Sequence, residues 1–283
     1  MRFTGSTIYK QHKTIYSMKI VTVIQARMSS TRLPGKVLLP ILGRPLLIRM
    51  IERVNSAKLI GQLVVATSVN SDDDEIEKLC ADNGINCYRG HLTDLLDRHY
   101  QVGKLFGAEA IVKIPSDCPL IDPGIIDKVL EYYINSDELD YVSNLHPASY
   151  PDGNDVEIFS FQAIECAWKD ATKDFEREHT TPFIWENKEH FAIGNVLWES
   201  GHDYSSSHRW TIDFPEDYEF IRKVYEALFP ANPLFSLGDI LDLLSQNPDI
   251  AGINSQYLGK YWYEEHLDEL QNINEYKDKI TKK

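Results

Sequence analysis

A regular alternation of short apolar runs and amphipathic segments is the feature that most restricts the fold of this chain. From Ile20 onward, each β-branched run is followed by a segment whose apolar residues recur at helical spacing. This pattern predicts a mainly parallel sheet flanked by helices, so the expected fold class is α/β. The expected strands are 20–24, 63–66, 86–88 and 110–114. The expected helices begin near Pro45 and Ser71 or cover 94–106 and 123–134, and the acidic run 71–74 is expected to cap the start of its helix.

Beyond Tyr141 the alternation is looser, which indicates strands of mixed direction. Strand candidates lie at 141–143, 156–159, 193–198 and 209–212, helices lie near Gln162 and Phe175, and the helical tail from Pro215 is broken at 230–233 and 247–248. We therefore expect one domain over 18–230 and a helical C-terminal extension over 231–283 that packs on it. Residues 1–17 are polar and basic, and we expect them to be a disordered N-terminal extension.

The bulk properties exclude several classes of protein. A formal charge of −14 argues against a protein that wraps nucleic acid, because such proteins need a broad cationic surface. No apolar run approaches the roughly 20 residues of a membrane-spanning helix. The four cysteines form no C-x-x-C pair, so they predict reduced thiols and a cytoplasmic protein without a zinc site.

The connection between the first strand and the first helix concentrates polar and cationic residues. It covers residues 25–36, QARMSSTRLPGK, and contains Arg27, Arg32 and Lys36. In an open α/β sheet this connection lies at the ligand crevice, where such side chains and exposed amides suit a polyphosphate. Val37 follows Gly35-Lys36, so this is no Walker A loop, and the glycine pattern of dinucleotide-binding loops is absent too. The alternative interpretation is a solvated basic surface.

Two aspartates follow apolar strand candidates and could meet at one edge of the sheet. Asp117 follows 110–114, and Asp213 follows 209–212. Mg²⁺ in nucleotide enzymes is bound by one or two carboxylates, with phosphate oxygens and waters completing its shell. The alternative interpretation is that each aspartate caps the helix beyond it.

The sequence resembles the spore coat polysaccharide biosynthesis protein F family, a branch of the cytidylyltransferases, from Lys19 onward. The resemblance rests on the loop 25–36 and on short motifs in matching order. These motifs are VATS (65–68), RG (89–90), DLLDR (94–98), DCPLI (117–121), YVSN (141–144), DVE (155–157) and REHT (177–180). The loop, the segment ending at Leu120 and TIDFPED (211–217) also resemble, more distantly, the 3-deoxy-manno-octulosonate and acylneuraminate cytidylyltransferases.

This resemblance implies a nucleotide-diphospho-sugar transferase fold of the GT-A type, a nucleotidyltransferase domain over 18–230 and Mg²⁺ as cofactor. It implies four catalytic residues, Arg27, Lys36, Asp117 and Asp213, of which the aspartates are the metal ligands. The predicted nucleotide-binding residues are Gln25, Ala26, Arg27, Met28, Ser29, Ser30, Arg32, Lys36, Ser68 and Arg98. For Arg98 the alternative interpretation is a helix-surface ion pair with Asp94.

The predicted acceptor-binding residues lie in the loosely patterned half, and they are Asn144, Asp155, Glu157, Glu178 and His179. His179 could bind the sugar or act as a base, and the alternative is a structural hydrogen-bonding residue. The acceptor itself could be a nonulosonate-like acid or a phosphorylated sugar.

The resulting hypothesis is a magnesium-dependent nucleotidyltransferase that joins a nucleoside monophosphate, from CTP by resemblance, to a sugar with release of pyrophosphate. Its product would serve polysaccharide or surface-glycan synthesis, and the resemblance further implies a homodimer. Two alternatives stay open: a glycosyltransferase of the same fold that uses a nucleotide-sugar, and a nucleotide-binding protein without catalysis. The cationic loop favours the first hypothesis, because a triphosphate needs all three cations.

Overall fold

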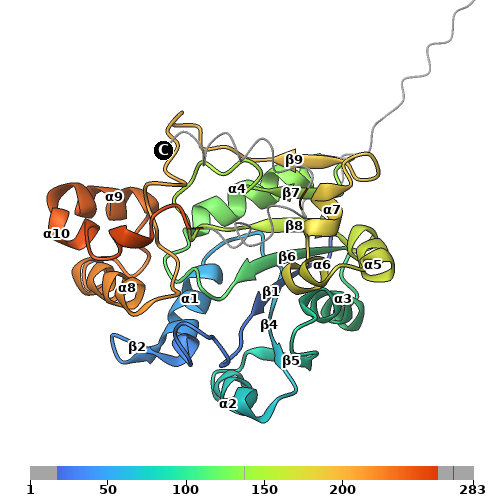
Figure 1. Cartoon of the computed structure of the whole chain (residues 1–283), viewed down its shortest axis with the longest axis horizontal. Coiled ribbons are helices and arrows are strands. Elements are labelled where there is room, and N and C mark those ends of the chain that lie inside the picture. Colours follow the sequence, from blue (N-terminus) through green and yellow to red (C-terminus); the bar gives the residue numbers. More distant parts are fainter. Residues whose placement is uncertain (1–17, 137, 261–269, 271–283) are drawn as a thin grey trace, which may run out of the picture.

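The computed structural model describes residues 18–136, 138–260 and Leu270 (Figure 1). The predictions of disorder over 1–17 and of helical structure over 261–269 and 271–283 lie outside the described residues. In the described part, no helix is long and apolar enough to cross a membrane.

One seven-stranded sheet forms the centre of the molecule, in the order β5-β4-β1-β6-β8-β7-β9. Pairing is parallel between β1 and both β4 and β6, between β4 and β5, and between β7 and β9, whereas β8 is antiparallel to β6 and β7. The prediction of a mainly parallel, mixed sheet is confirmed. The strands are β1 (Ile20–Gln25), β4 (Gln62–Ser68), β5 (Asn86–Gly90), β6 (Ala110–Pro115), β7 (Tyr141–Ser143), β8 (Glu157–Ser160) and β9 (Ile193–Asn195).

Helices cover both faces of the sheet because alternate strand residues point to opposite sides. In β1, Ile20 and Ile24 belong to one buried cluster, and Val21 and Val23 belong to another on the opposite face. Each cluster includes residues of one set of helices. The first set comprises α1 (Leu46–Val54), α2 (Asp74–Asp82) and α4 (Pro123–Ile134). The second comprises α3 (Leu95–Phe106), α5 (Phe161–Asp170), α6 (Asp174–His179) and α7 (Pro182–Glu186).

A third buried cluster joins the C-terminal helices to the domain (Figure 1). Phe220 and Ile240, from α8 and α9, pack in it with Ile41, Leu46 and Leu120. The helices are α8 (Pro215–Leu228), α9 (Leu237–Gln246) and α10 (Pro248–Ala251), and they are separated at the two predicted proline-containing breaks. Residues 231–260 therefore share a core with the sheet domain.

The strand predicted at 209–212 is wrong. This segment forms one isolated bridge, between Asp152 and Arg209, and joins no strand of the sheet. Its backbone bonds instead to loops, from Trp210 N to Asp152 O at 2.8 Å and from Ile212 N to Asp117 O at 2.9 Å. Apolar alternation within a segment cannot identify its hydrogen-bond partners.

Candidate active site

The carboxyl ends of three parallel strands meet at one edge of the sheet. Gln25 at the end of β1 is in register with Ala66 of β4 and with Pro115 of β6. The cationic loop after β1, Ser68 at the end of β4 and Asp117 after β6 are thereby brought to one edge. This is the place where open α/β sheets bind ligands.

The loop 26–36 is closed by its own backbone. Met28 O accepts from Ser30 N at 2.9 Å and from Gly35 N at 3.0 Å. Gly35 has φ 68, and a Cβ there would lie 3.4 Å from Met28 Cε. Glycine relieves the strain of this left-handed conformation, so Lys36 is presented from a fixed turn.

Asp73 anchors the loop to the neighbouring strand. Its carboxylate accepts from Met28 N at 2.7 Å, from Ser68 N at 3.1 Å and from the Ser68 hydroxyl. The prediction that the acidic run 71–74 caps the next helix through its side chains is wrong for Asp73, because neither the 3-10 turn η2 (Ser71–Asp73) nor α2 has a side-chain cap bond. The side chain is 1% exposed, a degree of burial that the sequence alone does not show.

Lys36 is the centre of the site. Its Nζ lies 3.0 Å from Asp213 Oδ1 and 3.6 Å from Asp117 Oδ2, and it donates to Ile212 O at 2.6 Å. Arg32 also reaches Asp213 Oδ1, at 3.0 Å. Two cations of the first loop and two acids from distant positions are thus placed in one cluster.

Backbone pairing explains why the two aspartates lie together. The carbonyl of Asp117 accepts from Ile212 N at 2.9 Å and from Thr211 Oγ1 at 3.0 Å. The helix-capping alternative is not what the structure shows. Asp122 caps α4 by accepting from Gly124 N at 2.7 Å, and Asp217 accepts the amides of Asp213 and Phe214.

A buried arginine, Arg209, pairs with Asp213 and with two further aspartates. Arg209, 4% exposed, contacts Asp217 at 3.0 Å, Asp213 at 3.2 Å and Asp152 at 3.3 Å. Asn254 donates to Arg209 O and to Asp217 Oδ1, each at 2.9 Å, so the C-terminal segment contributes to this network. Arg209 was missed as a site residue, and its place in an apolar, strand-like run gave no signal of this role.

Neighbouring carboxylates make the site strongly acidic. Burial and the charge of Asp117 raise the pKa of Asp155 to about 7. Burial and the charge of Asp155 likewise raise the pKa of Asp152 well above its usual value. For Asp213, burial acts in the same direction, but Lys36 and Arg32 hold its pKa below the ordinary value.

This donor set fits a divalent cation that also binds phosphate. Within the described chain, no three His, Cys, Asp or Glu side chains form a cluster that could hold a metal alone. Asp117 and Asp213 would supply two carboxylates, and Mg²⁺ usually takes its remaining ligands from phosphates and water. Burial first and neighbouring carboxylates second raise the pKa values of Asp152 and Asp155, and a bound cation would oppose the second effect.

Arg98, one of the predicted nucleotide-binding residues, reaches the end of β4 at the same edge. Arg98 is buried and donates to Ala66 O at 3.2 Å and to Leu92 O at 3.0 Å. Its predicted alternative, an ion pair with Asp94, is wrong, because Asp94 pairs with Arg177 at 2.6 Å. Gln25 Oε1, Thr67 Oγ1 and Arg98 Nε are buried without a hydrogen-bond partner among the described residues.

The outer part of the loop is more open. Arg27 lies 3.9 Å from Glu178, and both side chains are more than one-third exposed. Ser29 is exposed, and Ser30 Oγ accepts from Leu33 N at 3.4 Å. The exposed hydroxyls and guanidinium are thus accessible to a ligand, whereas Ala26 is buried and its amide bonds to Ala66 O at 3.0 Å.

Two of the predicted acceptor residues have structural partners. Asn144 donates to Asn154 O at 2.7 Å and accepts from Val156 N at 3.0 Å. Glu157 pairs with Lys113 and accepts from Tyr141 OH at 2.7 Å and from Thr181 Oγ1. Burial raises the pKa of Glu157, but Lys113 and these hydrogen bonds lower it below the ordinary value.

The other three predicted acceptor residues lie nearer the open side. Asp155 belongs to the acidic cluster, Glu178 faces Arg27, and half-buried His179 ends α6. Acceptor binding by all five residues stays a prediction.

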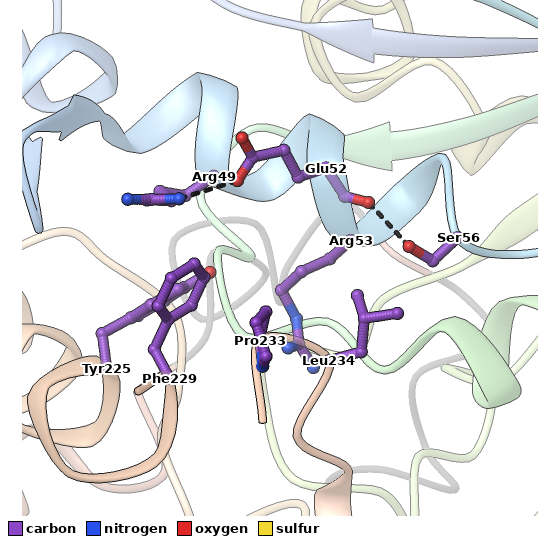
Figure 2. A pocket seen from close by; sticks show the side chains of 8 residues that line it. All are labelled: Arg49, Glu52, Arg53, Ser56, Tyr225, Phe229, Pro233 and Leu234. Atoms are coloured by element: carbon purple, nitrogen blue, oxygen red, sulfur yellow. Dashed lines mark hydrogen bonds and ion pairs between the residues drawn. The ribbon is translucent and has the colours of Figure 1, made fainter. Parts of the chain in front are cut away.

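A pocket of about 320 Å³ lies apart from this edge, between α1, α8 and the segment after α8 (Figure 2). Arg49 in its wall bonds to Glu52 at 3.0 Å and to Ile41 O at 3.1 Å, and Arg53 donates to Ile121 O and Phe235 O, each at 2.8 Å. None of the predicted site residues lines it, so we do not place the substrate there. The lining residues are Arg49, Glu52, Arg53, Ser56, Tyr225, Phe229, Pro233 and Leu234.

Comparison with protein families matches residues 21–237 to the cytidylyltransferase model. An uncharacterised protein of Methanocaldococcus jannaschii, MJ1063, is 36% identical over 249 residues, which are 87% of this chain and 99% of that protein. The spore coat polysaccharide biosynthesis protein SpsF of Bacillus subtilis is 31% identical over 240 residues, 82% of this chain and 96% of that protein.

Solved structures agree with this family match. A cytidylyltransferase from Leptospira borgpetersenii has a TM-score of 0.78 at 33% identity, covering 86% of this chain and 99% of that one. The CMP:2-keto-3-deoxy-manno-octonic acid synthetase complexed with CTP has a TM-score of 0.57 at 18% identity, covering 74% and 98%. The second similarity shows the fold alone, and it agrees with the predicted nucleotidyltransferase architecture.

Proposed function

Because this chain belongs to the cytidylyltransferase family, we propose that it transfers CMP from CTP to a sugar and releases pyrophosphate. Family membership makes it a nucleotidyltransferase, whereas the base, the acceptor and the metal belong to the proposal. One observation carries it: Lys36 from the loop after β1 lies within 3.6 Å of both Asp117 and Asp213. A cation on a turn and two acids beside it are what a metal-bound triphosphate requires.

The cationic loop supports a triphosphate rather than a nucleotide-sugar donor. Arg27, Arg32 and Lys36 come from ten residues of one loop, and Arg27 and Arg32 are 38% and 51% exposed. Exposed guanidiniums can exchange their carboxylate partners for phosphate oxygens at little cost, because a surface ion pair contributes only about 0–1 kcal/mol to folding stability. We therefore prefer nucleotidyl transfer to the glycosyltransferase alternative.

Asp117 and Asp213 are the residues that would hold Mg²⁺. The bound cation would neutralise charge on the phosphates and so assist attack at phosphorus. The protein supplies the orientation of these carboxylates, through the Asp117 carbonyl contacts of Ile212 and Thr211 and through Arg209 behind Asp213. Ligands held in this way need little rearrangement during the reaction.

The chemical step we propose is in-line attack by a sugar hydroxyl on the α-phosphorus of CTP. The new P–O bond forms as the bond to pyrophosphate breaks, and no covalent enzyme intermediate is needed. Lys36 and Arg32 stabilise the charge on the phosphates and on the departing pyrophosphate. Asp155, with a pKa of about 7, is able to accept the hydroxyl proton near neutral pH.

The similarity to SpsF supports a role in polysaccharide or surface-glycan precursor synthesis, in the cytoplasm where CTP is made. The acceptor would be a nonulosonate-like acid or a phosphorylated sugar. Without a cation, Asp152 and Asp155 would repel the carboxylate or phosphate of such an acceptor. We therefore expect that anionic group to bind on the side of Arg27.

The test is a pyrophosphate-release screen of the four nucleoside triphosphates against candidate sugars, with and without Mg²⁺. We expect release with CTP, one class of sugar and Mg²⁺, and none from Asp117→Ala. An Asp127→Ala variant is the matched control, because Asp127 binds the amides of Lys58 and Leu59 far from the loop in sequence. CTP binding without turnover for every sugar class would favour the non-catalytic alternative.

A further inference from the structure

Two cysteines that are separate in the sequence are paired in the fold. Cys80 lies in the last turn of α2 and Cys87 lies in β5. Cys80 belongs to the buried cluster under α2 and Cys87 packs against the same cluster, so the two thiols lie close enough to shift each other's pKa in opposite directions. The tight connection between them explains this contact, because Cys80 O accepts from Ile85 N at 2.9 Å and Gly84 turns the chain with φ 66.

The two thiols have different surroundings. Cys80 is fully buried in the cluster beneath α2, and Cys87 packs against that cluster while keeping partial exposure. The hydrogen bond from Cys80 and the nearby Arg89 lower the pKa of Cys87, although burial and Glu77 oppose this shift. A partly accessible sulfur with thiolate character beside a second thiol is the arrangement found at oxidation-sensitive cysteines.

We propose that Cys80 and Cys87 are an oxidation site, at which a peroxide converts the two thiols into an intrachain disulfide. The Cys87 thiolate attacks one peroxide oxygen and the O–O bond breaks, giving a sulfenic acid and water. The Cys80 sulfur then attacks the sulfenic sulfur, and the S–O bond breaks with release of a second water. The two thiols lose two electrons and two protons, and hydrogen peroxide is reduced to two waters.

The site adjoins the elements that hold the nucleotide loop. Arg89, two residues after Cys87, donates to Ser68 O at 2.8 Å and to Asn70 O at 2.6 Å, and it pairs with Asp74 at the start of α2. Asp73, which holds Met28 N, is close enough to Cys87 to affect its pKa. A disulfide here would link the last turn of α2 to β5, the strand that carries Arg89.

The chain contains a matched control thiol. Cys166 is partly exposed like Cys87, but its neighbour is Asp170, 3.5 Å from its sulfur. Burial and the hydrogen bond to Asp170 raise the pKa of Cys166. Cys166 and Cys87 are similarly exposed, but their surroundings shift the pKa in opposite directions. Comparing their reaction rates therefore separates the effect of the thiol pair from that of accessibility.

The experiment treats the reduced full-length protein with a small excess of hydrogen peroxide, stops the reaction with catalase and counts free thiols after denaturation. We expect four thiols to fall to two, with a peptide that links Cys80 to Cys87 and full recovery in dithiothreitol. The Cys166→Ser variant should form the same disulfide at the same rate. Cys80→Ser should stop at a Cys87 sulfenic acid that dimedone traps.

The wild-type protein alone can overturn the inference, so the result does not depend on how well a variant folds. Four thiols surviving, a disulfide between chains, or Cys166 reacting as fast as Cys87 would each contradict it. The inference is independent of the proposed use of CTP, because thiol counts and peptide masses do not require turnover.

Discussion

The site has a cationic side, formed by the loop 26–36, and an acidic side, formed by Asp117, Asp213 and the residues that hold them. The two sides differ in how exposed their arginines are. On the cationic side, Arg27 and Arg32 are 38% and 51% exposed and extend from a loop that is fixed through its backbone. On the acidic side, Arg209 and Asp217 are 4% and 0% exposed and bond to each other twice. The two arginines of the loop are accessible, whereas the Arg209–Asp217 pair is part of the protein interior.

This difference indicates a division of tasks. The acidic side fixes where the carboxylates of Asp213 and Asp117 lie before any ligand arrives, as electrostatic preorganisation requires. On the cationic side, the exposed side chains of Arg27 and Arg32 can move onto phosphates, while Lys36 is held in place by Ile212 O and Asp213. Substitutions on the acidic side should therefore reduce stability together with activity, and those on the cationic side should reduce activity with little loss of stability.

The largest effect is expected for Arg209→Met. This change leaves Asp217 buried and removes a partner of Asp213 and Asp152, and breaking a buried ion pair costs about 3–5 kcal/mol. Urea unfolding should show that loss. Arg222→Met is the control, because Arg222 pairs with Glu219 and Glu226 on the exposed face of α8 and should contribute about 0–1 kcal/mol. Equal losses in the two variants would contradict the contrast between the two sides.

Lys36→Ala should have the next largest effect, and it should fall on turnover. Removing one preorganised charged donor lowers kcat on the order of 10²-fold, or about 2.7 kcal/mol. Stability should change little, since Arg32 and Arg209 still neutralise Asp213. Pyrophosphate release and thermal unfolding measure the two quantities, with Lys104→Ala on α3 as a control. Near-normal turnover in the Lys36 variant would refute the site.

Asp73→Asn should have a smaller effect, on nucleotide binding. The amide keeps the size of the side chain but weakens the contacts to Met28 N and Ser68, at a cost of about 1–3 kcal/mol. We expect a higher KM for the nucleotide with a smaller change in kcat. Asp72→Asn, the exposed neighbour, should leave both constants unchanged. A KM that does not respond to Asp73 would show that the loop holds its shape without this anchor.

The sequence predicts the regular parts of this molecule well, because strand and helix periodicities are local properties. Strands β1, β4, β5 and β6 and helices α1, α3 and α4 lie where the pattern placed them, and Lys36, Asp117 and Asp213 lie in one cluster as predicted. The parts that depend on tertiary partners were harder to predict. Segment 209–212 bonds to two loops, and no local periodicity encodes that choice.

Side-chain partners were the least predictable feature of the site. Asp73 appeared as a helix-capping residue in an acidic run, and only its burial identifies it as an anchor for Met28. The alternative interpretation of Arg98 paired it with Asp94, four residues away, yet Asp94 pairs with Arg177 from α6. In each case a contact distant in sequence replaced the local one, since both are chemically equivalent and only the fold decides between them.

The smallest predicted effect concerns the charge of the acidic side. The folded-state pKa of Asp155, about 7, lies above the unfolded value, so the folded protein binds more protons between these values and loses stability as pH rises through 7. Asp155→Asn removes this penalty. Its melting temperature should exceed that of the wild type by about 2–5 °C at pH 8, with a smaller difference at pH 5. Mg²⁺ with CTP should reduce this difference in melting temperature at pH 8, because the cation stabilises the charged form of Asp155. The Asp174→Asn variant, at an exposed aspartate, should show no such pH dependence. An equal shift at both pH values would mean that Asp155 is not affected by its acidic neighbours, and the comparison of the two sides would then rest on Arg209 alone.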